Sequence, residues 1–263
     1  MRKYLAFTRG SFMVGLVYRF GPLLSLIGNF IYLGVAYYLW HSIYKNSDTL
    51  RSMTFNETFL YVAIGSAVFI LLKTYVDWEV SYEIREGIIS TYMTKPLDYQ
   101  TYILFTSLGQ TLMSLMVITI PTLLIITLVF KVAIPLGIGT LLFPLSLLLA
   151  FVISFCFDYF IGILAFYTES VWGLSTTKEI IILALSGALI PLQFFPAKLQ
   201  SILLLLPFQT IYHTPLMMLT KPDQDPQIFV SMLIVQVVWA VVLYALTRLF
   251  FEQAVKVLRI AGG

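Results

Sequence analysis

The sequence predicts an all-α membrane protein with six transmembrane helices. Of its 263 residues, 59% are hydrophobic and only 11% are charged, and the mean hydropathy is +0.91. A soluble domain carries roughly 25% charged residues, so this chain lacks the polar groups that a water-facing surface needs. Six stretches supply the ~20 mostly apolar residues that a spanning helix requires. They are residues 20–40, 55–76, 102–130, 136–167, 177–206 and 228–250.

The first nineteen residues are too charged to span a membrane. Arg2, Lys3, Arg9 and Arg19 are interspersed with apolar side chains such as Phe12. This mixture is typical of an amphipathic helix that lies in the interface with its cations toward the lipid phosphates. A frayed tail is the alternative. We therefore expect an N-terminal interfacial helix over residues 1–19 and a six-span domain over residues 20–263.

The third and fourth spans are longer than a bilayer requires. A helix of that length is accommodated by a tilt or a kink. Proline is the commonest cause of a sharp kink, so Pro121 and Pro144 are the expected places.

The fifth span is expected to be broken. Its first helix, residues 177–190, would be roughly 21 Å long at 1.5 Å per residue, which is short of the ~30 Å hydrocarbon core. Pro191 and Pro196 then interrupt it. Broken backbone at membrane depth must be sheltered by protein or face a water-filled cavity. We expect a half-helix and then a short re-entrant helix over residues 197–206, which returns to the outer face. A kinked ordinary span is the alternative.

The basic residues predict the orientation. With a cytoplasmic N-terminus, eleven of the sixteen fall on the cytoplasmic side and five fall outside. This bias follows the positive-inside rule, so both termini of a multi-pass protein of the cell membrane are expected in the cytoplasm. The inner set is Arg2, Lys3, Arg9, Arg19, Lys73, Arg85, Lys95, Lys178, Arg248, Lys256 and Arg259. The outer set is Lys45, Arg51, Lys131, Lys198 and Lys221.

Residues 77–100, between the second and third spans, concentrate charge in an otherwise apolar chain. Its charged side chains include Glu83, Arg85, Glu86 and Lys95. Apolar residues recur there at near-helical spacing, and Gly87 and Pro96 bracket a short helix of about eight residues. An exposed amphipathic helix on the cytoplasmic face suits docking in a partner's groove. A loop that lies on the lipid headgroups is the alternative.

The sequence contains no nucleotide site. It has neither a G-x-x-x-x-G-K-[ST] phosphate loop nor a G-x-G-x-x-G turn after a strand. If transport uses ATP, hydrolysis must therefore occur on another polypeptide. His41 and His213 could form a metal pair, but isolated interfacial histidines are commoner. The single cysteine, Cys156, excludes disulfides and thiolate zinc sites. We expect no catalytic residues and no metal on this chain.

Asp158 is the candidate for the translocation path. It lies within the fourth span, two turns or more from the cytoplasmic end. An ionisable group at that depth is a functional hypothesis by default. The alternative is that Asp158 lies within reach of water or pairs with a neighbouring helix.

Four motifs, taken in order, resemble the ABC type-2 transporter permeases. The order and spacing cover most of the chain, and the resemblance is strongest to the subfamily in which two permease genes accompany one ATPase gene. The motifs are E-I-R-E-G-I-I-S-T-Y-M-T-K-P-L-D (83–98), A-F-Y (165–167), S-G-A-L-I-P-L-Q-F-F-P (186–196), and L-P-F (206–208) with Tyr212 and Pro215. Tyr167 stands where many relatives have tryptophan.

The resemblance implies where the functional segments lie. A cytoplasmic coupling helix, about residues 86–96 within 77–100, would dock into the ATPase. A re-entrant outer segment, residues 186–215, would close the exit. The docking residues would be Glu83, Arg85, Glu86, Ile88, Ile89, Tyr92, Lys95 and Pro96. The exit-gate residues would be Ser186, Gly187, Pro191, Phe194, Phe195, Pro196 and Pro207.

The resemblance also implies an exporter complex. Two ATPase subunits would hold the ATP and Mg, and a second permease, either a sister chain or a second copy, would complete the path. Few polar groups lie in the spans, chiefly Asn29, Gln110, Asp158 and Gln236, which favours a hydrophobic or amphipathic substrate. The rival functions are an intramembrane enzyme, which would need clustered His, Asp or Glu at one depth, and a non-transporting scaffold that recruits an ATPase.

Overall fold

The computed structural model describes residues 2–18, 20–50 and 53–257. The predictions for Arg19, Arg51 and Arg259 lie outside these residues. The described chain is helical except for one small antiparallel hairpin, in which β1 (Thr49–Leu50) pairs with β2 (Met53–Thr54). We call the end of the molecule that holds this hairpin the hairpin end.

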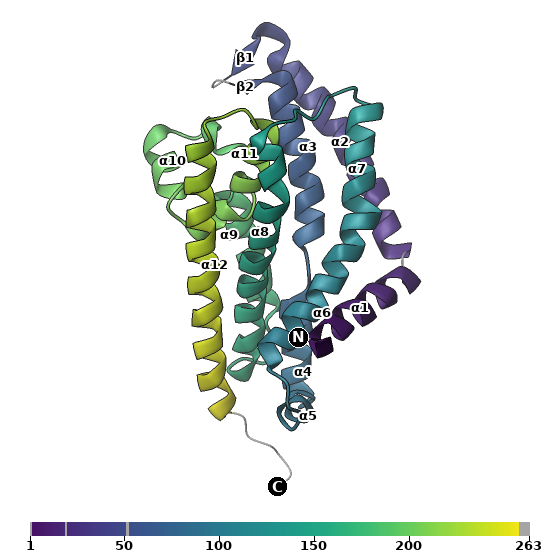
Figure 1. Ribbon diagram of the computed structural model, residues 1–263, viewed down its shortest axis with the longest axis vertical. Coiled ribbons are helices and arrows are strands. Elements are labelled where there is room, and N and C mark those ends of the chain that lie inside the picture. The colour runs from purple at the N-terminus through teal and green to yellow at the C-terminus, as the bar shows by residue number, and fades with distance from the viewer. Residues whose placement is uncertain (1, 19, 51–52, 258–263) are drawn as a thin grey trace.

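Long helices run side by side along the long axis of the molecule (Figure 1). They are α2 (Phe20–Ile43), α3 (Phe55–Leu72), α6 (Tyr99–Ser114) with α7 (Ile120–Leu128), α8 (Ile138–Ile163) and α12 (Pro226–Ala254). Within the described residues, five helical stretches are long and apolar enough to cross a membrane. They correspond to the first, second, third, fourth and sixth expected spans, so the all-α membrane class is confirmed.

The third span bends next to Pro121, as expected. Five residues, Leu115–Thr119, form a π-helical turn between α6 and α7, and Pro121 lies in the first turn of α7. Proline cannot donate the backbone hydrogen bond that would continue α6, and a π turn absorbs such a mismatch in the ladder. Figure 1 shows α6 and α7 at different inclinations. By contrast, α8 continues as one helix through Pro144.

The fifth expected span is broken, but its boundaries differ from the prediction. The helix α9 (Trp172–Leu185) is 14 residues long, and it begins and ends about five residues earlier than predicted. It ends there because Gly187 adopts a left-handed φ of 79°, which an L-side chain rarely tolerates. Two short helices follow, α10 (Ala197–Leu203) and α11 (His213–Thr220). The helix α11, all of which is buried, was not predicted from the sequence.

The charged segment after α3 contains two helices rather than one. Backbone between Leu72 and Val76 leaves helical geometry, with Tyr75 at φ 55°. The helix α4 (Val76–Arg85) follows, and then α5 (Ile89–Met93). The predicted eight-residue helix between Gly87 and Pro96 is therefore wrong in extent. Gly87, at φ 70°, ends α4 with a left-handed turn. We call this end of the molecule the α5 end.

The helix α1 (Arg2–Val17) crosses α6 obliquely at the α5 end (Figure 1). The Thr8 hydroxyl donates to the Phe105 carbonyl at 2.7 Å, and the Phe7 and Tyr102 rings meet edge to face at 4.8 Å. These contacts show an ordered helix, so the frayed-tail alternative is wrong.

Gly109 of α6 allows this close crossing. A Cβ built on Gly109 would lie 2.8 Å from the Ser11 Cβ and closer still to the Thr8 carbonyl. We expect Gly109→Ala to destabilise the protein by about 1–3 kcal/mol, because the backbone of α1 must shift. Gly10→Ala on α1 is the matched control, since that position is open, and it should leave the melting temperature unchanged or raise it. Thermal unfolding in detergent measures both. Equal melting temperatures for the two variants would contradict the crossing.

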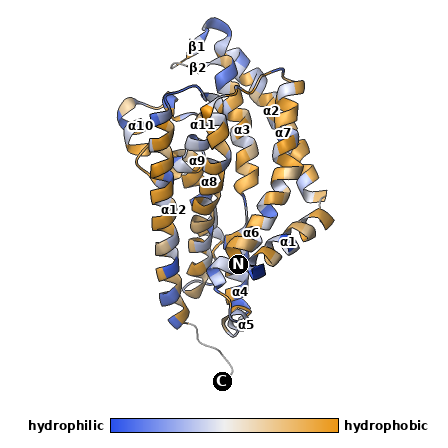
Figure 2. Ribbon diagram, in the orientation of Figure 1, coloured by the Kyte–Doolittle hydropathy of each residue, from blue (hydrophilic) through white to orange (hydrophobic). Residues whose placement is uncertain are grey.

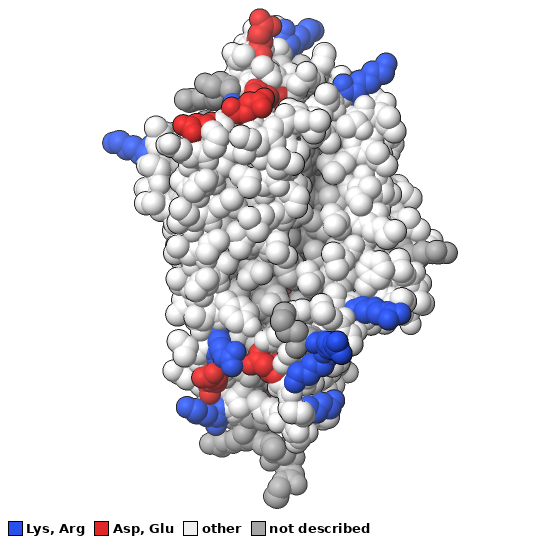
Figure 3. Space-filling model, viewed as in Figure 1, with Lys and Arg blue, Asp and Glu red and all other residues white. Residues whose placement is uncertain are grey.

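The outer surface between the two ends is apolar. Figure 2 shows hydrophobic residues along most of the length of the long helices, and Figure 3 shows charged side chains gathered in two bands at opposite ends of the visible face. Large exposed hydrophobics include Ile31, Leu141 and Val241. An apolar belt between two polar rims is what a bilayer requires, because no water reaches its core.

Candidate functional site

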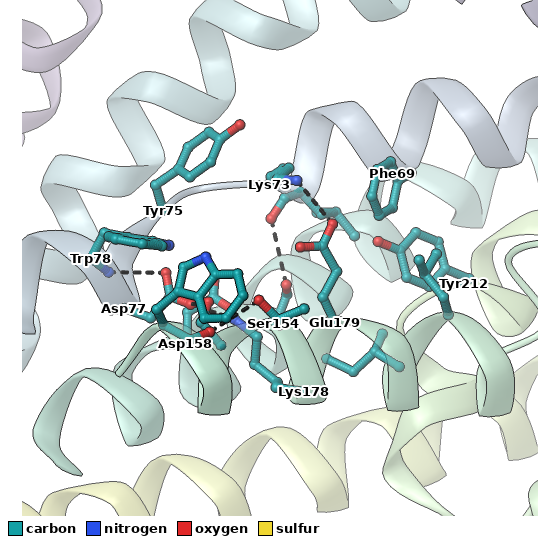
Figure 4. Close-up of a pocket in the computed structure, with 16 residues that line it drawn as sticks. Phe69, Lys73, Tyr75, Asp77, Trp78, Ser154, Asp158, Lys178, Glu179 and Tyr212 are labelled. Carbon is teal, nitrogen blue, oxygen red and sulfur yellow. Dashed lines mark hydrogen bonds and ion pairs between the residues drawn. The ribbon is translucent and has the colours of Figure 1, made fainter. Parts of the chain in front are cut away.

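A cavity of about 420 Å³ opens beside the break between α3 and α4. Its walls come from the end of α3, the start of α4, the inner part of α8, and α9 (Figure 4). Two groups of side chains line it. The charged group is Lys73, Asp77, Asp158, Lys178 and Glu179, and the aromatic group is Phe69, Tyr75, Trp78, Trp172 and Tyr212.

Two buried carboxylates and one mostly buried lysine form the inner wall of the pocket. The Lys178 ammonium lies 2.8 Å from Asp77 and 2.5 Å from Asp158. The Thr74 hydroxyl donates to Asp158 at 2.9 Å, and the Ser175 hydroxyl donates to Asp77. One lysine of α9 is therefore shared by a carboxylate of α4 and a carboxylate of α8. We call Asp77, Asp158 and Lys178 the charge triad.

A second ion pair lies nearer the mouth. The Lys73 ammonium is 2.9 Å from Glu179, and about a third of each side chain is exposed. The same ammonium lies 5.5 Å from the Phe69 ring centroid and 5.4 Å from that of Tyr75. These distances are within the range of cation–π attraction. Lys73 thus occupies a position bounded by one carboxylate and two aromatic rings.

The sequence identified only one member of the charge triad as a site residue. For Asp158, the structure shows an ion pair with Lys178 of a neighbouring helix, at the wall of the pocket. Its partner Lys178 enters the sequence-based prediction only as one of the basic residues that indicate the membrane orientation. A stronger signal was present: residues 175–179 form a run of five polar residues near the start of the expected fifth span, and Ser175 lies three and four residues before Lys178 and Glu179. The sequence does not indicate which helices these polar side chains contact.

Two of the other polar groups in the spans hold helices together. The Asn29 amide donates to the Thr122 hydroxyl at 3.0 Å, which joins α2 to α7. The Gln236 amide donates to the carbonyls of Ser146 and Thr210 at 3.0 and 2.7 Å. Both side chains are buried in these pairs, so they do not line the pocket. Gln110, by contrast, is exposed.

The predicted docking residues divide into an exposed set and a buried set. Arg85, Glu86 and Ile88 are exposed at the turn from α4 to α5, and Lys95 and Pro96 are exposed after α5. The others face inward. Ile89 is fully buried, Glu83 accepts a 2.6 Å hydrogen bond from the Tyr99 hydroxyl, and the Tyr92 ring stacks on Tyr102 at 4.8 Å. The inward set fixes α5 to the start of α6, and the exposed set remains available to a partner.

The helix α4 is packed tightly against α8. A Cβ on Gly162 of α8 would lie 2.7 Å from the Val80 Cβ. Asp77 lies one turn earlier on α4 and contributes to the charge triad. A displacement of the exposed turn after α4 would therefore reach the pocket through a single short helix.

The predicted exit-gate residues lie in the broken segment between α9 and α11. The Tyr61 hydroxyl donates to the Gly187 carbonyl at 3.0 Å, and the His213 backbone N–H donates to the Ser186 carbonyl at 3.2 Å. Phe194 lies 5.6 Å from Trp40, measured between ring centroids. Pro191 and Pro207 are buried, Phe195 is partly buried and Pro196 is exposed. These contacts hold the segment against α2, α3 and α11.

The two histidines lie in different surroundings. His41 packs against Tyr37 and Phe55, and the His213 Nδ1 lies 3.2 Å from the buried Tyr61 hydroxyl. In the part of the chain that the structure describes, no group of three or more His, Cys, Asp or Glu residues is placed to hold a metal ion.

The comparison with protein families gives a match over most of the chain. A family described as "ABC-2 family transporter protein" matches residues 30–262. No curated protein matches the chain.

Proposed function

This chain belongs to the ABC-2 family of transporter proteins, and we propose that it is the permease subunit of an exporter whose ATPase is a separate chain. Membrane components of this family work with ABC ATPase subunits and lack ATPase activity themselves. The direction of transport, the docking site and the substrate path are parts of the proposal. ATP and Mg would bind on the partner ATPase.

The charge triad is the observation that carries the proposal. It joins α4, α8 and α9 at one point. The helix α4 continues into the exposed turn and α5, and α9 leads into the broken segment. Charges in a low-dielectric setting attract strongly, and separating them is costly. A movement of α4 would therefore displace Lys178 and α9 together with Asp77.

The proposed cycle starts at the α5 end, which we place in the cytoplasm. Closure of the ATPase dimer pushes the exposed turn of Arg85, Glu86 and Ile88. The backbone break between α3 and α4 lets α4 tilt, since those residues have already left helical geometry. The pocket then closes from the inside, and the broken segment that includes Gly187 opens the outer exit.

The broken segment fits a re-entrant outer gate. A 14-residue α9 spans about 21 Å, and the polar backbone that follows is covered by α2, α3 and α11. In this proposal α1 lies at the membrane interface, and the divided α9 segment counts as the fifth of six spans. A second permease, a sister chain or another copy, would face the pocket and complete the path.

The test is reconstitution with a cognate ABC ATPase taken from the gene neighbourhood of the chain. We expect the two proteins to co-purify, and we expect ATP hydrolysis to change when the permease is present. In a Cys156→Ala background, a cysteine at Glu86 should react with a membrane-impermeant maleimide only in inside-out vesicles, and a cysteine at Lys45 only in right-side-out vesicles. Absence of a complex, or the opposite labelling pattern, would overturn the proposal.

A further inference from the structure

We propose that the pocket beside the charge triad binds a hydrophobic monocation, an amine or quaternary ammonium ion with an apolar tail. That such a cation is also the transported substrate rests on the proposed function, whereas its binding rests on the pocket alone. A cavity of about 420 Å³ falls within the size range of small-molecule sites, roughly 300–1,000 Å³.

The charge of the pocket favours a cation. Its lining holds three carboxylates, on Asp77, Asp158 and Glu179, against the two ammonium groups of Lys73 and Lys178. One negative charge is therefore in excess among the lining residues. Low-dielectric walls focus the field of such a charge onto whatever enters. A monocation would neutralise the pocket, whereas an anion would double the excess.

Lys73 shows that these walls already hold an ammonium group. Its Nζ lies 2.9 Å from Glu179 and about 5.5 Å from the ring centroids of Phe69 and Tyr75. A carboxylate combined with aromatic faces is the chemistry by which proteins recognise ammonium ions. The chain's own lysine thus occupies one cation position. Because its ion pair with Glu179 is partly exposed, a ligand cation can displace the lysine ammonium at low cost.

The pocket separates a charged end from an apolar end. In Figure 4, Trp78, Asp77 and Asp158 lie together on one side, Phe69 and Tyr212 lie on the other, and the Lys73–Glu179 pair lies between them. Trp78 and Trp172 are 44% and 63% exposed, so ring surface remains for a ligand. A cationic head at the carboxylates would place its tail along the apolar side, which leads toward Ile182 and Leu183.

The test measures binding to the chain alone, in nanodiscs of phosphatidylcholine. Replacing Trp40 and Trp239 by phenylalanine leaves Trp78 and Trp172 as the fluorescent reporters. We expect hexyltrimethylammonium to give a saturable change in their fluorescence. Hexanesulfonate and hexanol, which carry the same tail with a negative head and a neutral head, should bind at least tenfold more weakly. Equal binding of the three compounds, or no saturable change, would overturn the proposal.

Two variants identify the groups that bind. Asp158→Asn should weaken hexyltrimethylammonium at least tenfold, because it removes the excess charge. Lys73→Met should tighten it severalfold, because it frees Glu179 and the rings of Phe69 and Tyr75. Weaker binding to Lys73→Met, in protein that melts like the wild type, would contradict the assignment.

Saturable binding without any change in ATP hydrolysis by the reconstituted complex would retain the site and reject the cation as substrate. Failure to assemble with an ATPase would reject the proposed function alone.

Discussion

Lys178→Met is expected to destabilise the protein by about 3–5 kcal/mol, because it leaves Asp77 and Asp158 buried without their shared cation. The side chain of Lys178 is 13% exposed, and those of its two partners are less than 10% exposed. Methionine keeps most of the volume of the lysine side chain, so the loss reports on charge rather than on packing. Unfolding followed by circular dichroism in mixed detergent micelles measures it.

Lys73→Met is the matched control for this prediction. The same substitution at Lys73, the residue that directly follows α3, removes an ion pair of similar length, but both partners are about one-third exposed. Exposed pairs contribute about 0–1 kcal/mol, so the control should unfold nearly as the wild type does. The triple variant Lys178→Met, Asp77→Asn, Asp158→Asn should recover part of the loss, since neutral groups need no counter-charge. Equal losses for the two lysines would contradict the account of the charge triad.

The sequence predicted the long helices well because the bilayer permits few other structures. A stretch of twenty apolar residues in lipid must pair its own backbone groups, which makes it a helix. The break in the fifth span was also predictable, because Pro191 and Pro196 interrupt helical hydrogen bonding there. The exact end of α9 was not predictable, because it depends on the left-handed turn at Gly187 and on what Tyr61 and His213 bond there.

The charge triad could not be assembled from the sequence. Asp77, Asp158 and Lys178 come from three separate segments, and hydropathy does not say which helices are neighbours. Asp158 was conspicuous because it lies within a span, whereas Asp77 and Lys178 looked like ordinary rim charges. The helix α4 was missed for a related reason. The sequence predicts only one short helix in this segment, between Gly87 and Pro96, whereas Val76, Val80 and Ile84 bury one face of a separate helix before it.

Ile88→Asp is expected to weaken assembly with the ATPase by about thirtyfold or more. Ile88 is an exposed apolar residue in the turn between α4 and α5, where we propose that the ATPase docks. Loss of a central apolar contact in an interface costs about 2 kcal/mol or more, and each 1.4 kcal/mol is a factor of ten in affinity. The substitution should spare folding, because Ile89 rather than Ile88 is the buried residue. Binding of the purified ATPase to nanodiscs that hold each variant measures the effect.

Leu136→Asp is the matched control. Leu136 is an exposed apolar residue before α8, toward the opposite end of the molecule, so a new carboxylate there should leave ATPase binding at the wild-type level. Similar losses for the two variants would mean that the carboxylate acts through general instability. A normal affinity for Ile88→Asp would show that the ATPase docks elsewhere.

Photo-cross-linking in the assembled complex shows whether the turn between α4 and α5 contacts the ATPase. The photoreactive residue p-benzoylphenylalanine is placed at position 88 or at position 136, and the complex is irradiated after purification. We expect a covalent adduct with the ATPase from position 88 and none from position 136. An adduct from position 136, or none from position 88 in a complex that co-purifies, would contradict the proposal that the turn between α4 and α5 couples this permease to its ATPase.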